Sequence, residues 1–118
     1  MNGQTVLAEA WEDRSELSRM DGPALWERFP NGNWLFQEWW HGGERHRVGA
    51  PAILNYNDEG TGQLQSEEWW VDGERHREDG PAKVVYDQVT GDVAGCEWWI
   101  RGVQIDHEKL FPGQGTLL

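Results

Sequence analysis

The sequence contains little of what disulfide-bonded, membrane-spanning or redox proteins depend on. Of its 118 residues one is cysteine, two are methionine and three are phenylalanine. A single cysteine, Cys96, excludes an internal disulfide and is typical of a reducing compartment. No apolar run approaches the length of a membrane span, and the start of the chain lacks the basic and apolar segments of a secretory signal. We therefore expect a cytoplasmic protein without membrane contact.

Basic residues are also scarce. Ten lysines and arginines stand against 21 aspartates and glutamates, which gives a net charge of −11. Sequence-independent binding to nucleic acid or to an anionic membrane needs a cationic surface, so we expect neither. An acidic chain can instead bind a protein that has a basic surface. The alternative is that the carboxylates only keep a tryptophan-rich surface soluble.

Tryptophan is abundant, and its placement shows a repeat. Nine tryptophans include three adjacent pairs, each preceded by a glutamate and followed three residues later by a glycine. The pairs recur at intervals of 30 and 29 residues, and Pro51 and Pro81 each stand twelve residues after the first tryptophan of a pair. Trp11 and Pro23 keep this spacing, so a degenerate half-unit opens the chain. The pairs are Trp39 with Trp40, Trp69 with Trp70, and Trp98 with Trp99.

Each unit has the pattern of a β-hairpin. Runs of bulky residues follow the prolines and end at turns rich in Asn, Asp and Gly, which is typical of first strands. The second strands end in the tryptophan pairs, and short segments at 44–47 and 74–77 can pair as strand edges. Near the start, helix-forming residues compete with the repeat register, and a strand is favoured over a helix for residues 5–19. The first strands are expected at 24–29, 52–56 and 82–86.

The predicted fold is all-β, an antiparallel β-meander or hairpin repeat array that forms one domain over residues 1–118. It has three units of about 30 residues, and the tail at 107–118 is expected to cap the last one. Because side chains alternate across a strand, the two tryptophans of a pair should face opposite sides of the sheet. One row can form the core, while curling strands, the tail, a second copy or a partner must cover the other; the pattern leaves open which row is exposed. The units are 1–19 for the half-unit, then 20–47, 48–77 and 78–106.

One string in the second unit carries a resemblance. The string W-x-x-G-x-x-H-R-x-D-G-P-A, which begins at Trp70 and ends at Ala82, resembles the repeat of small phage and giant-virus proteins and is distantly similar to MORN-type β-hairpin repeats. The match covers residues 10–106, although Ala50 splits the turn motif in the first unit and "GVQIDH" replaces "GERHR" in the third. The resemblance implies an all-β array of viral or prophage origin whose role is binding, without catalytic residues.

The histidines of the repeat are the main candidates for chemistry. His46 and His76 on neighbouring strands could share a metal ion, but the positive charge of the adjacent arginines opposes a bound cation. No third ligand recurs with the two histidines. We therefore expect no metal, no cofactor and no catalytic residue, and predict that the chain is not an enzyme. In the favoured alternative, Glu44 and Glu74 pair with arginines while His and Arg stems pack on indoles and donate to turn carbonyls.

The Gly-Pro-Ala turn is expected to act as a stop between hairpins. Proline fixes φ and removes one donor, and a positive φ is expected at the glycine before it. A bulkier residue at that glycine should then be destabilising. The residues expected to have structural roles are Trp39, Trp69, Trp98, His46, Arg47, His76, Arg77, Gly80 and Pro81.

The predicted function is a non-enzymatic protein-binding module: a small acidic phage-type protein that binds and inhibits a host protein, such as a nucleic-acid-binding defence enzyme, in the host cytoplasm. DNA mimicry is one route to such inhibition. The alternatives are a homo-oligomeric structural or virion-associated protein, and a protein that binds carbohydrate or aromatic ligands through exposed indoles. Partner contacts are expected on one tryptophan row and at the variable hairpin tips. The candidates are Trp40, Trp70, Trp99, Asp58, Glu59, Asp87, Asp92 and Glu67.

Overall fold

The structure, a computed structural model, describes residues 7–106. These residues form an eight-stranded antiparallel sheet and three two-stranded ribbons, with no helix among them. In spatial order the main sheet contains β1 (Leu7–Ala10), β4 (Leu25–Arg28), β5 (Trp34–Glu38), β8 (Ile53–Tyr56), β9 (Leu64–Glu68), β12 (Lys83–Tyr86), β13 (Val93–Ile100) and β14 (Val103–Ile105). The ribbons are β2 (Glu12–Asp13) with β3 (Glu16–Leu17), β6 (Trp40–His41) with β7 (Glu44–Arg45), and β10 (Trp70–Val71) with β11 (Glu74–Arg75).

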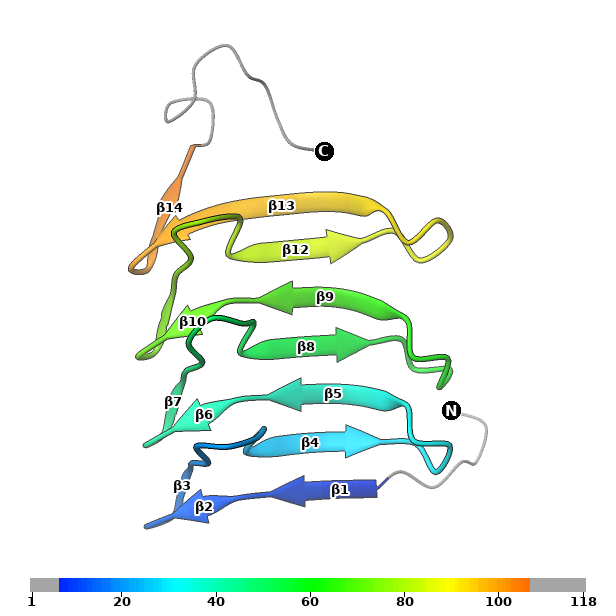
Figure 1. Cartoon of the computed structure of the whole chain (residues 1–118), viewed down its shortest axis with the longest axis vertical. Coiled ribbons are helices and arrows are strands. Elements are labelled where there is room, and N and C mark those ends of the chain that lie inside the picture. Colours follow the sequence, from blue (N-terminus) through cyan, green and yellow to red (C-terminus); the bar gives the residue numbers. More distant parts are fainter. Residues whose placement is uncertain (1–6, 107–118) are drawn as a thin grey trace.

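The main sheet is a meander: when the ribbon strands are left out, each of its strands pairs with the next one along the chain. The ribbons lie at one end of the strands and the hairpin tips at the other (Figure 1). The predicted all-β class and antiparallel arrangement are therefore confirmed, and β4, β8 and β12 fall in the expected first strands. Of the segment 5–19, the described part from residue 7 onward contains three strands and no helix. The expected cap at 107–118 lies outside the described residues.

The second strand of a unit is interrupted at the first tryptophan of the pair. The Trp39 N–H donates to the carbonyl of Ala52 at 2.7 Å, while its own carbonyl accepts from the His46 N–H at 3.0 Å. One side of the residue thus bonds to the main sheet and the other to the chain leaving the ribbon. Trp69 repeats the pattern. The chain therefore passes from sheet to ribbon at this residue, except in β13, which runs through Trp98 without a break.

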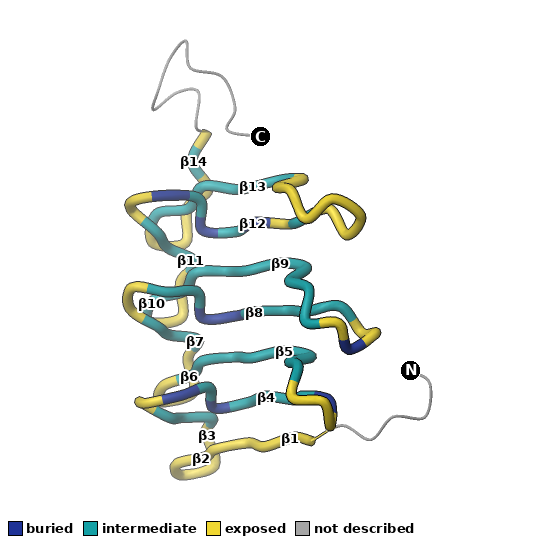
Figure 2. The backbone as a smooth tube through the Cα atoms, turned by 45° about the vertical axis from the view of Figure 1, so that its right-hand side comes forward, coloured by how far each residue is buried: buried dark blue, intermediate teal, exposed yellow. Residues whose placement is uncertain are grey.

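Few residues are fully buried, and most of those have small side chains. No tryptophan belongs to this set, and all but one of the nine are half-buried (Figure 2). Neither indole row is fully buried, and the eight strands of the main sheet lie side by side in one layer. Gly22, Gly60 and Gly80 are buried as well. The buried hydrophobic residues, all at most 5% exposed, are Ala24, Phe29, Ala52, Ile53, Ala82 and Val84.

Each of the three ribbon turns, and the turn between β13 and β14, has two central residues with positive φ, the type I′ pattern of tight hairpins. The pairs are Arg14 (54°) and Ser15 (68°), Gly42 (57°) and Gly43 (79°), Asp72 (49°) and Gly73 (78°), and Arg101 (47°) and Gly102 (79°). The second turn residue also lies against the preceding ribbon. A Cβ at Gly43 would collide with the carboxylate of Glu16, and one at Gly73 would lie 2.9 Å from Oε2 of Glu44. Glycine at these positions lets consecutive ribbons approach closely.

We expect Gly43→Ala to lower the free energy of unfolding by about 1–3 kcal/mol for the positive φ alone, with a further loss because the Glu16 carboxylate must move. Gly91→Ala is the matched control, since Gly91 has a φ of 80° and open space around it. Urea unfolding followed by tryptophan fluorescence measures both. If the two variants unfold at the same denaturant concentration, the contact between Glu16 and Gly43 does not couple the ribbons.

Candidate functional site

Three arginines each lie over a first-row tryptophan, which is Trp11 or the first tryptophan of a pair. The guanidinium carbon is 4.0 Å from the ring centroid for Arg19 on Trp11, 3.8 Å for Arg47 on Trp39 and 3.8 Å for Arg77 on Trp69. The same guanidiniums donate to the carbonyls of the turn prolines Pro23, Pro51 and Pro81 at 3.3, 3.2 and 3.2 Å. Each arginine therefore ties an indole to the Gly-Pro-Ala turn.

The second tryptophans form a ladder with two other arginines. Arg45 lies between Trp40 and Trp70, at 5.2 and 5.0 Å from the ring centroids. Arg75 lies between Trp70 and Trp99, at 5.0 and 4.9 Å. The ladder crosses from unit to unit, so each of these cation–π contacts also stabilises the stacking of neighbouring ribbons. Neither Arg45 nor Arg75 was predicted as a site residue from the sequence, although arginine recurs at that position of the ribbon segment.

Glutamates two residues earlier fix the second-row indoles. The indole N–H of Trp70 donates to Glu68 at 3.1 Å, and Arg75 donates to the same oxygen at 2.8 Å. Burial alone would raise the pKa of Glu68, but the hydrogen bonds from Arg75 and Trp70 and the charges of Arg75 and Lys83 outweigh it, and the net shift is downward. Trp69 instead donates to Glu67. The hydrogen-bond and cation–π partners of Trp69 and Trp70 are different residues, as expected if adjacent indoles face opposite sides.

The repeat histidines link one unit to the next. Nδ1 of His46 accepts the Asp72 N–H at 3.0 Å, and Nδ1 of His76 accepts the Arg101 N–H at 2.9 Å. An Asp72 carboxylate oxygen also lies 3.3 Å from Nδ1 of His46. We favour the acceptor role because it recurs in His76 and in the hydroxyl of Ser18, which accepts from the next turn without such a carboxylate. The ring proton then resides on Nε2. The histidines were expected to donate to turn carbonyls, whereas in the structure they accept from turn N–H groups.

The repeat glutamates have different roles from those expected. Glu44 and Glu74 form no ion pair with an arginine among the described residues, and lie instead over the glycine of the next ribbon turn. The ion pair with Arg75 is made by Glu68 in the main sheet. Residues 7–106 also place no group of three or more His, Cys, Asp or Glu side chains where it could hold a metal ion.

The glycine of the Gly-Pro-Ala turn lies against the stacked arginine of its unit. Gly80 does not have the positive φ expected from the turn motif, so that explanation was wrong. A Cβ at Gly80 would lie 2.7 Å from Cζ of Arg77, and one at Gly22 equally close to Cζ of Arg19. At these two turns the glycine lies directly against the guanidinium that stacks on the indole. Glycine is not required for the stacking, because Ala50 stands at this position after the first tryptophan pair and Arg47 still lies 3.8 Å from the Trp39 ring centroid.

The hairpin tips hydrogen-bond to one another. Asn31 and Asn33 both donate to the Gly60 carbonyl, at 3.0 and 2.8 Å, and Gln63 donates to the Gln88 carbonyl at 3.0 Å. In the third tip the carboxylate of Asp87 accepts two backbone N–H groups, from Thr90 and Val89, and these bonds lower the pKa of Asp87. The tips therefore form a continuous second edge of the array.

The candidate partner-binding residues lie on three separate surfaces. Trp40, Trp70 and Trp99 belong to the arginine ladder at the ribbon end of the strands. Asp58, Glu59, Asp87 and Asp92 are exposed at the tips, at the opposite end (Figure 2). Glu67 accepts hydrogen bonds from Trp69 and from the Tyr86 hydroxyl. Burial, that hydrogen bond and the charge of Glu67 raise the pKa of Tyr86 to about 12.

The division of charge between scaffold and surface is uneven. Within residues 7–106, 15 of 20 carboxylate side chains belong to exposed residues, whereas seven of nine cationic residues are half-buried. The six arginines that stack on indoles are all in the half-buried group; the sixth is Arg28, 5.0 Å from the centroid of Trp26. The exposed cations are Arg14, at a ribbon turn, and Arg101, at the turn between β13 and β14. The surface is therefore more acidic than the net charge of the chain implies.

Comparison with known proteins adds no assignment. No protein-family model, curated protein or solved structure matches the chain. The resemblance to phage and giant-virus repeats thus stays a prediction. In the part of the chain that the structure describes, no helix is long and apolar enough to cross a membrane.

We expect Arg75→Gln to lower the free energy of unfolding by about 1–3 kcal/mol, because it removes two cation–π contacts of about 0.5–1 kcal/mol each and the ion pair with Glu68. Arg101→Gln makes the same charge change at an exposed turn and should have little effect. Urea unfolding measures both. Equal stability of the two variants would show that the ladder does not stabilise the array.

We expect the stability to fall as pH rises from 10 toward about 12, because unfolded tyrosine loses its proton near 10 while folded Tyr86 keeps it to about 12. Below pH 10 both states hold the proton and the contribution is fully present. Tyr86→Phe should remove part of this alkaline dependence. Urea unfolding at several alkaline pH values, with tyrosinate absorbance in parallel, measures it, and an unchanged pH dependence in the variant would contradict the assignment.

Proposed function

We propose that the chain is a non-enzymatic protein-binding module whose acidic surface binds a basic surface of a partner protein. The observation that carries this proposal is the division of charge: six arginines are stacked on indoles, while 15 of the 20 described carboxylates are exposed. Exposed charges of one sign attract a partner of the opposite sign and increase its association rate.

The magnitude of the surface charge favours a particular kind of contact. Of the fifteen exposed carboxylates in residues 7–106, Glu9, Asp21 and Asp79 pair with half-buried arginines. With the two exposed arginines subtracted as well, ten net negative charges remain. Eight strands span about seven spacings of 4.8 Å, or about 34 Å. Ten charges over that length give about one per 3.4 Å, against about one per 1.7 Å for duplex DNA. Because these charges are spread over two edges, attraction by sign explains binding better than imitation of duplex phosphate spacing does.

In its finer form, the proposal is that a phage-type inhibitor occupies the basic groove of a host enzyme that binds nucleic acid, inside the host cytoplasm. Such a groove is cationic because it must neutralise phosphates. The hairpin tips support this form because they are exposed and acidic, and because hydrogen bonds between the tips hold them in one row. Asp58, Glu59 and Asp92 have no side-chain hydrogen bond or ion pair within the described residues, so they can contact a partner without loss to the scaffold.

Affinity capture from a bacterial lysate at low and high salt, with mass spectrometry, tests the proposal. Two variants that each remove three negative charges should behave differently: the tip variant loses the captured partner, and the ribbon variant retains it. High salt should release the partner from the wild type. Capture of only the chain itself, or retention of the partner by the tip variant, would contradict the proposal. The tip variant is D58N/E59Q/D92N and the ribbon variant is E16Q/E44Q/E74Q.

A homo-oligomeric structural protein is the second candidate, and one observation favours it. Strand β1 pairs with β4 along one edge, all four of its residues are exposed, and no described strand pairs with the other edge. Such an edge can pair with a second chain. Sedimentation at two salt concentrations separates the candidates, because a salt-insensitive dimer or ring supports assembly and a monomer opposes it. The third candidate is ligand binding through exposed indoles. It would depend on Trp11, which is the single exposed tryptophan in the described residues, at 42%.

A further inference from the structure

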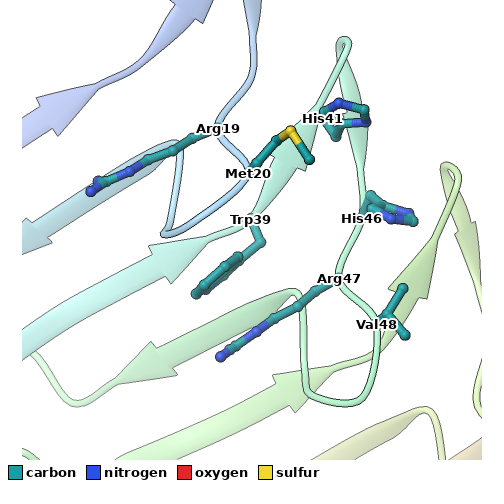
Figure 3. Close-up of a pocket in the computed structure, with 7 residues that line it drawn as sticks. All are labelled: Arg19, Met20, Trp39, His41, His46, Arg47 and Val48. Atoms are coloured by element: carbon teal, nitrogen blue, oxygen red, sulfur yellow. The ribbon is translucent and has the colours of Figure 1, made fainter.

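A pocket of about 310 Å³ lies where the opening half-unit meets the first full unit. It is formed by the loop before Pro23, the end of β5, the ribbon β6–β7 and the segment that follows it (Figure 3). Met20 lies between Arg19 and His41 in this view, and the Arg47 side chain runs alongside Trp39. The lining residues are Arg19, Met20, Trp39, His41, His46, Arg47 and Val48.

The lining contains no carboxylate, which is unusual on so acidic a chain. The matching positions of the repeat explain why. Where the other units have Asp21 and Asp79, paired with Arg19 and Arg77, the first unit has Gly49. Glu78, which lies 3.4 Å from Nε2 of His76, is replaced by Val48, and the acceptors Glu9 and Glu67 of the first-row indoles are replaced by Gln37.

These three replacements leave donors without acceptors around the pocket. Arg47 forms no ion pair within the described residues, and its remaining contacts are the indole of Trp39 and the carbonyl of Pro51. The indole N–H of Trp39 is buried and has no hydrogen-bond partner. The Nε2 of His46 carries the ring proton, because Nδ1 accepts the N–H of Asp72. An unmatched donor costs about 1–3 kcal/mol, so an acceptor that a ligand supplies to His46 would be favourable, whereas the Trp39 N–H is covered by its surroundings.

We infer that this pocket binds a small organic monoanion, whose carboxylate accepts a hydrogen bond from Nε2 of His46, at the place where Glu78 faces Nε2 of His76 in the next unit, and whose apolar part packs against Met20 and Val48. The Arg47 side chain extends from the other side of the segment (Figure 3) and contributes its positive charge to the wall of the pocket. The pocket volume suits a ligand about the size of benzoate. The preference for a single negative charge follows from the neighbouring groups. Asp21 and Glu9 lie 3.2 and 3.9 Å from the Arg19 guanidinium and offset its charge, and Asp72 lies beside His46 at the rim. One uncompensated guanidinium therefore remains, that of Arg47.

The test is titration of the whole chain with benzoate, followed by the NMR signal of the Trp39 indole N–H, which is assigned with Trp39→Phe. Benzamide, which has the same shape without the charge, and inorganic phosphate are the comparison ligands. We expect a saturable shift of the Trp39 signal with benzoate and little shift with benzamide or phosphate. No shift with benzoate, or equal shifts with benzamide, would overturn the inference.

A pair of variants at an exposed position tests the location of the site without disturbing the fold. Val48 is 78% exposed. Val48→Glu restores the carboxylate that Glu78 provides beside His76, and it should weaken benzoate binding by about tenfold or more, because an internal anion then competes for the same donors. Val48→Gln has nearly the same shape without the charge, and it should bind benzoate as the wild type does. Equal affinity of the two variants would overturn the assignment to this pocket.

Discussion

The stacking of guanidinium groups on indoles is the interaction on which this structure depends. A single-layer sheet has no opposing layer against which its large side chains can be buried. An indole carries 150–250 Å² of surface, so it has to be covered by another side chain. The planar guanidinium does this at low desolvation cost, since it attracts the ring face and keeps its edge hydrated. Tryptophan and arginine therefore recur together, and each of the three proline turns accepts a hydrogen bond from one of these arginines at its proline carbonyl.

The same arrangement determines the electrostatics of the surface. The stacked arginines are held at the indoles, so most carboxylates of the turns and tips have no cation beside them and these regions stay negative. This negative surface has two consequences for an open array. It opposes pairing of the free edge of β1 with another chain, because like charges repel along the whole length. It also makes a basic partner the favoured one, which links the scaffold to the proposed function.

Much of the fold followed from periodicity, whereas the roles of individual residues did not. Proline spacing and turn residues located β4, β8 and β12, because hairpin chemistry is local. Alternation along a strand does not distinguish a buried face from one covered by arginine, so the extent of indole burial could not be predicted. The partners of Arg45 and Arg75 are in the neighbouring unit, about 25 residues away in the chain. At Gly80 the steric reason for glycine depends on where the Arg77 guanidinium lies, which is a tertiary feature.

A repeat protein provides its own reference for detecting a binding site. Each unit touches only its neighbours, so an interaction that one unit does not make has no substitute elsewhere in the array. Gln37, Val48 and Gly49 each replace an acidic residue found in another unit, where the three carboxylates face a first-row indole, the histidine and the stacked arginine. Each replacement alone is an ordinary divergence. Together they remove the carboxylates that face Trp39, His46 and Arg47 while the donors remain, and a ligand that supplies an acceptor to His46 would recover part of the free energy that the unmatched donors cost.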